Sequence, residues 1–188
     1  MERQHIAEFD YDRHEIERAL FFLSNALQDS GHNTKPVLLH SIQVAEMLWE
    51  RDFSQDAVIA AVLHDVVEDT AITIEDVEQH FGEQVAQYVN ALTISDTQDA
   101  TQSFARTAEL GSEALSIRAA DLIQNSHYYH LAPIDMQRQL RNKFVYFMNL
   151  SQDLLGEPLA TELDGAYRQN VEKLPTAPEP DDFSRSST

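Results

Sequence analysis

Apolar residues recur every three or four positions along most of this chain. Between residues 12 and 28 this spacing places Ile16, Leu20 and Leu23 on one face, and residues 37–49 repeat the pattern. It is the period of an amphipathic helix whose apolar side packs against a core. The pattern predicts two helices, at 12–28 and 37–49.

A different pattern marks the next segment, AVIAAVLHDVVED, which covers residues 57–69. It is apolar nearly all round as far as His64, as expected of a helix that is buried on every side. Ser54 precedes it as a helix-capping residue, and Asp56 lies in the first turn, where acidic side chains are favoured. We predict a central buried helix that ends in a group of polar residues.

Local signals divide the rest of the chain into further helices. Thr73 followed by Asp76 resembles a capping box, and Gly82 is suited to end the helix that it opens. Pro133 interrupts a later segment. There is no convincing strand pattern and no internal repeat, so the predicted fold is all-α. The remaining helices are expected at residues 83–92, about 100–109, 113–128, 135–155 and 158–173, with a loop at 93–99.

The length of 188 residues fits one domain with a tail. We expect a single domain over residues 1–173 and a disordered tail over 174–188, which is rich in Pro, Ser and acids. The absence of cysteine excludes disulfides and thiolate zinc sites. No apolar stretch reaches the ~20 residues of a membrane span, and the N-terminus lacks a signal-peptide core. These features predict a soluble cytoplasmic protein.

The charge balance limits the choice of partners. With 13 basic and 32 acidic residues the formal net charge is -19, and such a surface repels polyanions. We therefore expect no DNA or RNA binding. A small phosphorylated ligand would need a metal ion and local cations. The candidate cations are Lys35, Arg106, Arg118 and Lys143.

Four residues in three predicted helices form a candidate metal site. His64 and Asp65 are adjacent at the end of the apolar run, while His40 and Asp121 lie in helices on either side of it in the chain. Imidazole and carboxylate ligands without sulfur favour Mn²⁺, Fe²⁺, Mg²⁺ or Zn²⁺. Four protein ligands leave positions for water and substrate on an octahedral ion, and a bound water loses its proton more easily.

A second acidic pair follows the His-Asp pair by one helical turn. His64 and Glu68 are four residues apart, and so are Asp65 and Asp69, which predicts one polar stripe on the helix. In a metal site, Glu68 and Asp69 would orient or deprotonate water. The alternative is a structural network of ion pairs, although basic partners are scarce nearby. The other histidines are assigned to the surface or to packing: His5, His14, His32, His80, His127 and His130.

These motifs resemble the HD superfamily of metal-dependent phosphohydrolases. The similarity is greatest to the alarmone-hydrolase domain of RelA/SpoT-type enzymes and to the small Mesh-type hydrolases. It covers about residues 18–150 and rests on three segments: KPVLLHSIQVAEML, the run from AVIAAVLHDVVEDT through TIEDVEQHFG to NALT, and IRAADLIQNSHYY. The resemblance implies an all-α fold and hydrolysis of guanosine 3′,5′-bis(diphosphate), ppGpp.

The resemblance also implies roles for individual residues. The ion is usually manganese, held by the residues that match His40, His64, Asp65 and Asp121. The pair that matches Glu68 and Asp69 serves hydrolysis of the 3′-pyrophosphate. The asparagine that matches Asn125 contacts substrate.

Two positions depart from the family pattern. Members usually carry a basic residue, commonly arginine, shortly before the first ligand helix, but the segment Gly31–Lys35 contains no arginine. Tyr128 stands where many members have a small polar residue. Both differences fall on substrate contacts and leave the identity of the nucleotide open. We expect Lys35 and Arg118 to supply the positive charge that holds phosphate, because each lies close in sequence to a predicted metal ligand.

Three functional hypotheses follow. The first is a Mn²⁺-dependent pyrophosphohydrolase acting on ppGpp. The second keeps the metal and hydrolyses another 2′- or 3′-phosphorylated nucleotide. The third is a non-catalytic module that binds a nucleotide or a partner protein and uses the metal structurally. Against the third stands the acidic pair Glu68-Asp69, which a structural site does not need. The oligomeric state is left open by the sequence.

Overall fold

Helices account for all the regular structure in the part of the chain that the computed structural model describes, residues 11–28, 35–94 and 100–176. The all-α prediction is therefore confirmed. In chain order the elements are α1 (Arg13–Leu27), α2 (Val37–Trp49), α3 (Gln55–Leu63), α4 (Val66–Asp69), α5 (Ile74–Phe81), α6 (Glu83–Leu92), α7 (Ala100–Leu110), α8 (Ser112–Ser126), the 3-10 turn η1 (Tyr129–Leu131), α9 (Ile134–Ser151), α10 (Leu159–Ala166) and the π-helical turn η2 (Tyr167–Val171).

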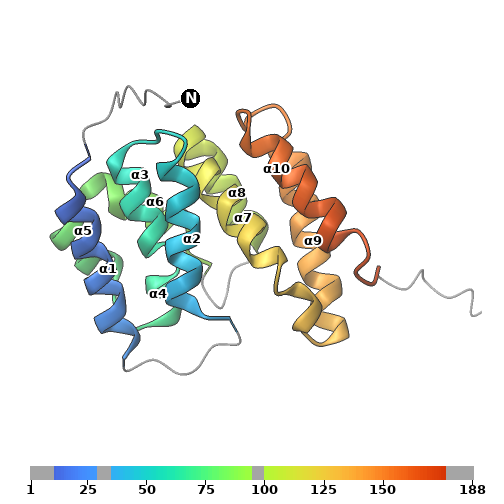
Figure 1. Ribbon diagram of the computed structural model, residues 1–188, viewed down its shortest axis with the longest axis horizontal. Helices are drawn as coiled ribbons and strands as arrows, with labels where there is room; N and C mark the ends of the chain where they lie inside the picture. Colours follow the sequence, from blue (N-terminus) through green and yellow to red (C-terminus); the bar gives the residue numbers. More distant parts are fainter. Residues whose placement is uncertain (1–10, 29–34, 95–99, 177–188) are drawn as a thin grey trace, which may run out of the picture.

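Helix α3 lies at the centre of the N-terminal group of helices (Figure 1). Every residue from Ala57 to Leu63 is buried, and the helix packs against α1, α2, α6 and α8. Three of these residues are alanines, whose small side chains let neighbouring helices approach closely. The prediction of a central buried helix is confirmed, and its C-terminal end delivers His64 to the middle of the molecule.

The helix ends follow the local signals of the sequence. Ser54 caps α3, since its hydroxyl accepts a hydrogen bond from the Ala57 amide, and Thr73 and Asp76 form both bonds of a capping box at α5. Gly82 ends α5 with a positive φ of 89°, a conformation that costs glycine little. The predicted break at Gly31–Thr34 and residues 95–99 of the predicted loop lie outside the described residues.

The structure corrects the prediction of one continuous helix over residues 57–69. Helix α3 ends at Leu63, Asp65 has φ -100° and ψ 0°, and α4 starts at Val66. Adjacent residues of a regular helix point about 100° apart. The break instead brings His64 Nε2 within 3.2 Å of Asp65 Oδ2, so both side chains face the same point. The four polar residues are therefore not one helical stripe.

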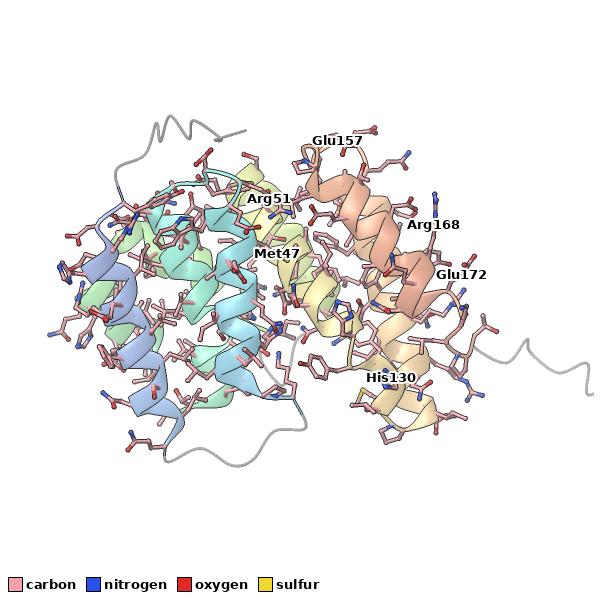
Figure 2. All side chains as sticks on the ribbon, in the orientation of Figure 1. Met47, Arg51, His130, Glu157, Arg168 and Glu172 are labelled. Carbon is pink, nitrogen blue, oxygen red and sulfur yellow. The ribbon has the colours of Figure 1, made fainter. Side chains whose placement is uncertain are left out.

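The C-terminal helices cover the side of α8 away from α1 (Figure 1). Arg51, at the end of α2, forms an ion pair with Glu162 of α10, and Figure 2 shows its side chain on the face of α2 that looks toward α10. Leu174, the first residue of the predicted tail, is buried among the helices. The tail beyond Thr176 lies outside the described residues, and its disorder stays a prediction. Among the described residues, no helix is long and apolar enough to span a bilayer.

Candidate metal centre and substrate pocket

Three helical segments bring the four predicted metal ligands together. His40 comes from α2, His64 and Asp65 from the break between α3 and α4, and Asp121 from α8. One ligand atom of each lies within 4.8 Å of the others. The two imidazole Nε2 atoms are 3.2 Å apart, and Asp121 Oδ1 is 3.2 Å from that of His40 and 3.4 Å from that of His64. This geometry matches a shared cation.

The hydrogen bonds of the cluster also fit a cation. His64 Nδ1 donates to the carbonyl of Ala61 at 2.8 Å. In the neutral ring this leaves Nε2 with a lone pair, which points at the Nε2 of His40 and at Asp121. Lone pairs that converge in a buried space repel one another unless a proton or a metal ion lies between them. The residues present therefore fit a divalent ion.

Protons compete with such an ion. Burial disfavours the charged form of His64, but the carboxylates of Asp65 and Asp121 outweigh it and raise its pKa to about 10. Burial lowers the pKa of His40, against the opposing effect of Asp121. Burial acts to raise the pKa of Asp65, but His64 and Lys35 hold it below its ordinary value. Metal binding must displace a proton from this cluster, so it becomes tighter as the pH rises.

The two predicted phosphate-binding cations lie beside the carboxylate ligands. Lys35 Nζ donates to Asp65 Oδ2 at 2.7 Å and to Asn125 Oδ1 at 3.1 Å. Arg118 is buried and donates to Asp121 Oδ2 at 2.7 Å. The expectation that basic partners are scarce is therefore wrong, because both carboxylates have one.

Arg118 is held on several sides. Its second Nη group donates to the carbonyl of Leu92 and, at 3.1 Å, to the hydroxyl of Ser103, and its guanidinium lies 5.5 Å from the Phe104 ring centroid. The bond to Asp121 Oδ2 leaves Oδ1 facing the histidines, and Asn125 Nδ2 donates to that Oδ1 at 2.6 Å. Arg118 and Asn125 thus fix the orientation of the Asp121 carboxylate.

The second acidic pair lies next to the four predicted ligands and outside their cluster. Glu68 and Asp69, both on α4, line the adjoining cavity. Glu68 Oε1 accepts a hydrogen bond from the amide of Ile94 at 2.7 Å. Much of the Glu68 side chain is exposed, yet desolvation of its carboxyl group and the charge of Asp65 raise its pKa to about 7. A carboxylate with this pKa is suited to accept a proton near neutral pH.

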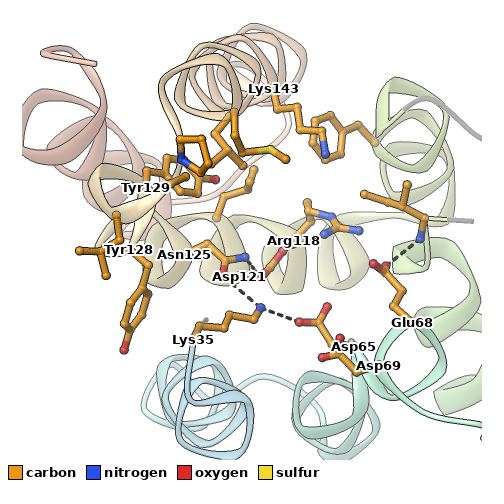
Figure 3. A pocket seen from close by; sticks show the side chains of 18 residues that line it. Lys35, Asp65, Glu68, Asp69, Arg118, Asp121, Asn125, Tyr128, Tyr129 and Lys143 are labelled. Atoms are coloured by element: carbon orange, nitrogen blue, oxygen red, sulfur yellow. Dashed lines mark hydrogen bonds and ion pairs between the residues drawn. The ribbon is translucent and has the colours of Figure 1, made fainter. Parts of the chain in front are cut away.

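A cavity of about 520 Å³ opens from the metal cluster (Figure 3). One wall carries the predicted site residues except His40 and His64, which do not line the cavity. Arg106, a further candidate cation, does not line it either. Most of the opposite wall, which comes from η1 and α9, was not predicted from the sequence. Helical spacing from Asn125 could have indicated Tyr129, four residues later. The side chains of this far wall are Tyr129, Leu131, Pro133, Met136, Leu140 and Lys143.

An all-α fold with a buried His, His-Asp and Asp donor set beside a cavity defines the HD class of metal sites. The family model of the HD domain matches residues 19–143, so this chain belongs to the HD-domain family. The resemblance read from the sequence is confirmed. Among curated relatives, the guanosine-3′,5′-bis(diphosphate) 3′-pyrophosphohydrolase of Aquifex aeolicus is 37% identical over 86 residues, or 44% of this chain.

A second curated relative is also named as a (p)ppGpp hydrolase. The bifunctional (p)ppGpp synthase/hydrolase SpoT of Escherichia coli is 40% identical over 62 residues, or 33% of this chain. The chain matches only 12% of the length of the Aquifex protein and 9% of SpoT. The matches therefore concern a single part of much longer proteins.

Solved structures share the fold. A structure described as a metazoan ortholog of SpoT that hydrolyzes ppGpp superposes with a TM-score of 0.67 at 24% identity, covering 86% of this chain and 98% of that one. A crystal structure from Listeria monocytogenes has a TM-score of 0.57 at 27% identity, covering 71% and 99%. Both chains are matched over almost their whole length, which supports the same helical architecture.

Proposed function

We propose that this protein hydrolyses ppGpp with a divalent metal ion and releases the 3′-pyrophosphate. The observation that carries the proposal is the convergence of four candidate ligand atoms within 4.8 Å, three of them from buried residues, beside a cavity that two further acids line. Relatives named as ppGpp 3′-pyrophosphohydrolases support the choice of substrate.

In this proposal the ion is Mn²⁺, with Fe²⁺, Zn²⁺ or Mg²⁺ as alternatives of similar ligand preference. The ligands are His40, His64, Asp65 and Asp121. When bound, the ion supplies Lewis acidity and lowers the pKa of water. Glu68 and Asp69 orient the attacking water and accept its proton, because they line the cavity and are surplus to a four-ligand site.

The substrate contacts are proposed to be Lys35 and Asn125. Burial disfavours the charge of Lys35, but Asp65 and Asp121 outweigh burial and raise its pKa, so the ammonium stays protonated. It lines the cavity and can reach a phosphate oxygen once the ion neutralises Asp65. Arg118 was expected to bind phosphate too. Because both its Nη groups are engaged, we assign it to positioning Asp121.

A second candidate is hydrolysis of a different phosphorylated nucleotide. Tyr128 lines the cavity where many family members have a small polar residue, and Gly31–Lys35 contains no arginine. A bulkier ring at the substrate side changes the shape of the space for the nucleotide. The two candidates share the metal chemistry and differ in the product.

The deciding experiment measures products. Purified protein with Mn²⁺ is given ppGpp and a panel of 2′- and 3′-phosphorylated nucleotides, and pyrophosphate and orthophosphate are quantified separately. Pyrophosphate from ppGpp supports the proposal, and orthophosphate from another nucleotide supports the second candidate. A variant with Glu68→Gln and Asp69→Asn controls for contaminating hydrolases. Metal binding without any product would indicate a non-catalytic module.

A further inference from the structure

Tyr129 stands out on the far wall of the cavity. It is the first residue of η1, is only 5% exposed and lines the cavity (Figure 3). Its ring packs edge-on against Phe144, with centroids 6.4 Å apart. The ring is therefore fixed in the core, and the hydroxyl has a defined position.

That hydroxyl makes no hydrogen bond to any of the described residues. The other buried tyrosine of the described residues is paired: Tyr88 donates to Glu113 at 2.6 Å. Tyrosine hydroxyls inside proteins usually find a partner. That of Tyr129 is not among the buried polar atoms that lack one, so it is accessible from the cavity that Tyr129 lines. Tyr129 is thus a donor held in place without an acceptor.

The charged groups around Tyr129 belong to the metal centre. Burial and the carboxylate of Asp121 raise the pKa of Tyr129, against the opposing effect of Arg118. The phenol therefore stays neutral near neutral pH and can donate a hydrogen bond. An oxyanion is the acceptor that such a donor prefers, and the cavity beside Asp121 is where the proposed function places a phosphate group.

We propose that Tyr129 donates a hydrogen bond to an oxygen of the bound substrate's 3′-pyrophosphate. The inference rests on the proposed function and adds a substrate contact to it. This contact comes from the far wall, so the pyrophosphate is held from two sides: by Lys35 and Asn125 near the metal ligands, and by Tyr129 across from them.

The test uses Tyr129→Phe, which removes only the hydroxyl, and Tyr146→Phe as a matched control, since Tyr146 lies on α9, is exposed and does not line the cavity. A hydrogen bond to a charged group changes affinity roughly tenfold. We therefore expect Tyr129→Phe to lower kcat/KM for ppGpp about tenfold, mainly through KM, and to raise the Kd of inorganic pyrophosphate on the Mn²⁺-loaded protein by a similar factor. Metal content and Tm should not fall, because the hydroxyl has no partner in the protein.

The outcomes distinguish a substrate contact of Tyr129 from a structural role. Unchanged kcat/KM and unchanged pyrophosphate affinity in Tyr129→Phe would overturn the proposal, as would a loss of Tm or metal that indicates a structural role. An equal effect in Tyr146→Phe would also overturn it. If the wild-type protein does not hydrolyse ppGpp but Tyr129→Phe still weakens pyrophosphate binding in calorimetry, the tyrosine contact is supported and the proposed substrate is wrong.

Discussion

The two walls of the cavity are built on different principles. On the metal wall the functional side chains are tied to one another: His64 to the Ala61 carbonyl, Asp121 to Arg118, and Asp65 to Lys35. On the far wall the side chains are mostly apolar, and its polar groups, the Tyr129 hydroxyl and the Lys143 ammonium, have no partner among the described residues. One wall is organised in advance around a small cation, whereas the other leaves its polar groups to a ligand.

This difference predicts how substitutions act. Groups that are fixed by neighbours before the reaction begins stabilise the transition state without rearrangement, so their loss removes the reaction. Groups that meet the ligand only when it binds contribute to its affinity. Changes on the metal wall should therefore lower metal binding or kcat, and changes on the far wall should raise KM.

The largest effect is expected from Asp65→Ala. The substitution removes a ligand atom from the cluster and leaves the charge of Lys35 unpaired. Binding of an ion to the folded state raises Tm, so the Mn²⁺-dependent rise in Tm should disappear together with the bound metal and the activity. Elemental analysis and thermal melts with and without Mn²⁺ provide the measurement.

Asp153→Ala is the matched control, because Asp153 is an exposed acid in the turn after α9. It should keep the metal and the rise in Tm. Stoichiometric metal in the Asp65→Ala protein would contradict the assignment of Asp65 as a ligand.

The second effect separates binding from chemistry on the metal wall. Glu68→Gln combined with Asp69→Asn should keep the metal but lower kcat by ~10²-fold or more, the usual scale for losing general acid–base assistance. Glu75→Gln, an exposed acid on α5, controls for the change of charge. If the double variant keeps wild-type turnover, these acids have a structural role.

A pH profile sharpens the role of Glu68. As a base it must be ionised, so kcat should rise as the pH increases through its pKa. That pKa is about 7 without an ion, and the positive charge of bound metal moves it lower. The acidic limb of kcat at saturating Mn²⁺ should therefore have its midpoint at or below this value and should vanish in Glu68→Gln. An unchanged limb in that variant would assign it to another group.

The two walls also differ in how far the sequence reveals them. The metal wall rests on short motifs: the His-Asp pair, the acidic pair one turn later, and Asp121 four residues before Asn125. Buried charges in an apolar run are conspicuous because they are costly without a partner. The helices, their caps and the four converging ligands were therefore predictable.

Other features depend on tertiary contacts. The break at His64–Asp65 has no breaker residue, because the local sequence favours a continuous helix and only the packed structure turns both side chains to one point. Two of the partners of Arg118, Leu92 and Ser103, come from α6 and α7. Tyr129 and Leu140 look like ordinary core residues in the sequence, and only the fold places them at the cavity.

Lys35 contacts the predicted ligand Asp65 and also lines the cavity. The effect of its loss should therefore lie between those expected for the metal wall and for the far wall. Lys35→Met removes the ammonium that contacts Asp65 and Asn125. If the lysine binds phosphate, KM for ppGpp should rise about tenfold with a smaller change in kcat, since the contact exists in the ground state as well. If it only neutralises Asp65, Mn²⁺ should bind more tightly and KM should stay constant. Steady-state kinetics and Mn²⁺ titration, compared with Lys173→Gln at an exposed site, distinguish these results.

The smallest effect is expected on the far wall from Lys143→Gln. Lys143 reaches over the cavity from α9, opposite Asp65 (Figure 3), and is exposed. Exposed charge pairs contribute only about 0.2–1 kcal/mol, so KM for ppGpp should rise by no more than about fivefold, with kcat and metal content unchanged. The difference from wild type should shrink in high salt, because ions screen a solvated pair. Lys173→Gln provides the same change of charge away from the cavity. A KM effect that persists in high salt would mean that the ligand buries Lys143. The far wall would then form a desolvated contact with the ligand, in contrast to the solvated contact expected here.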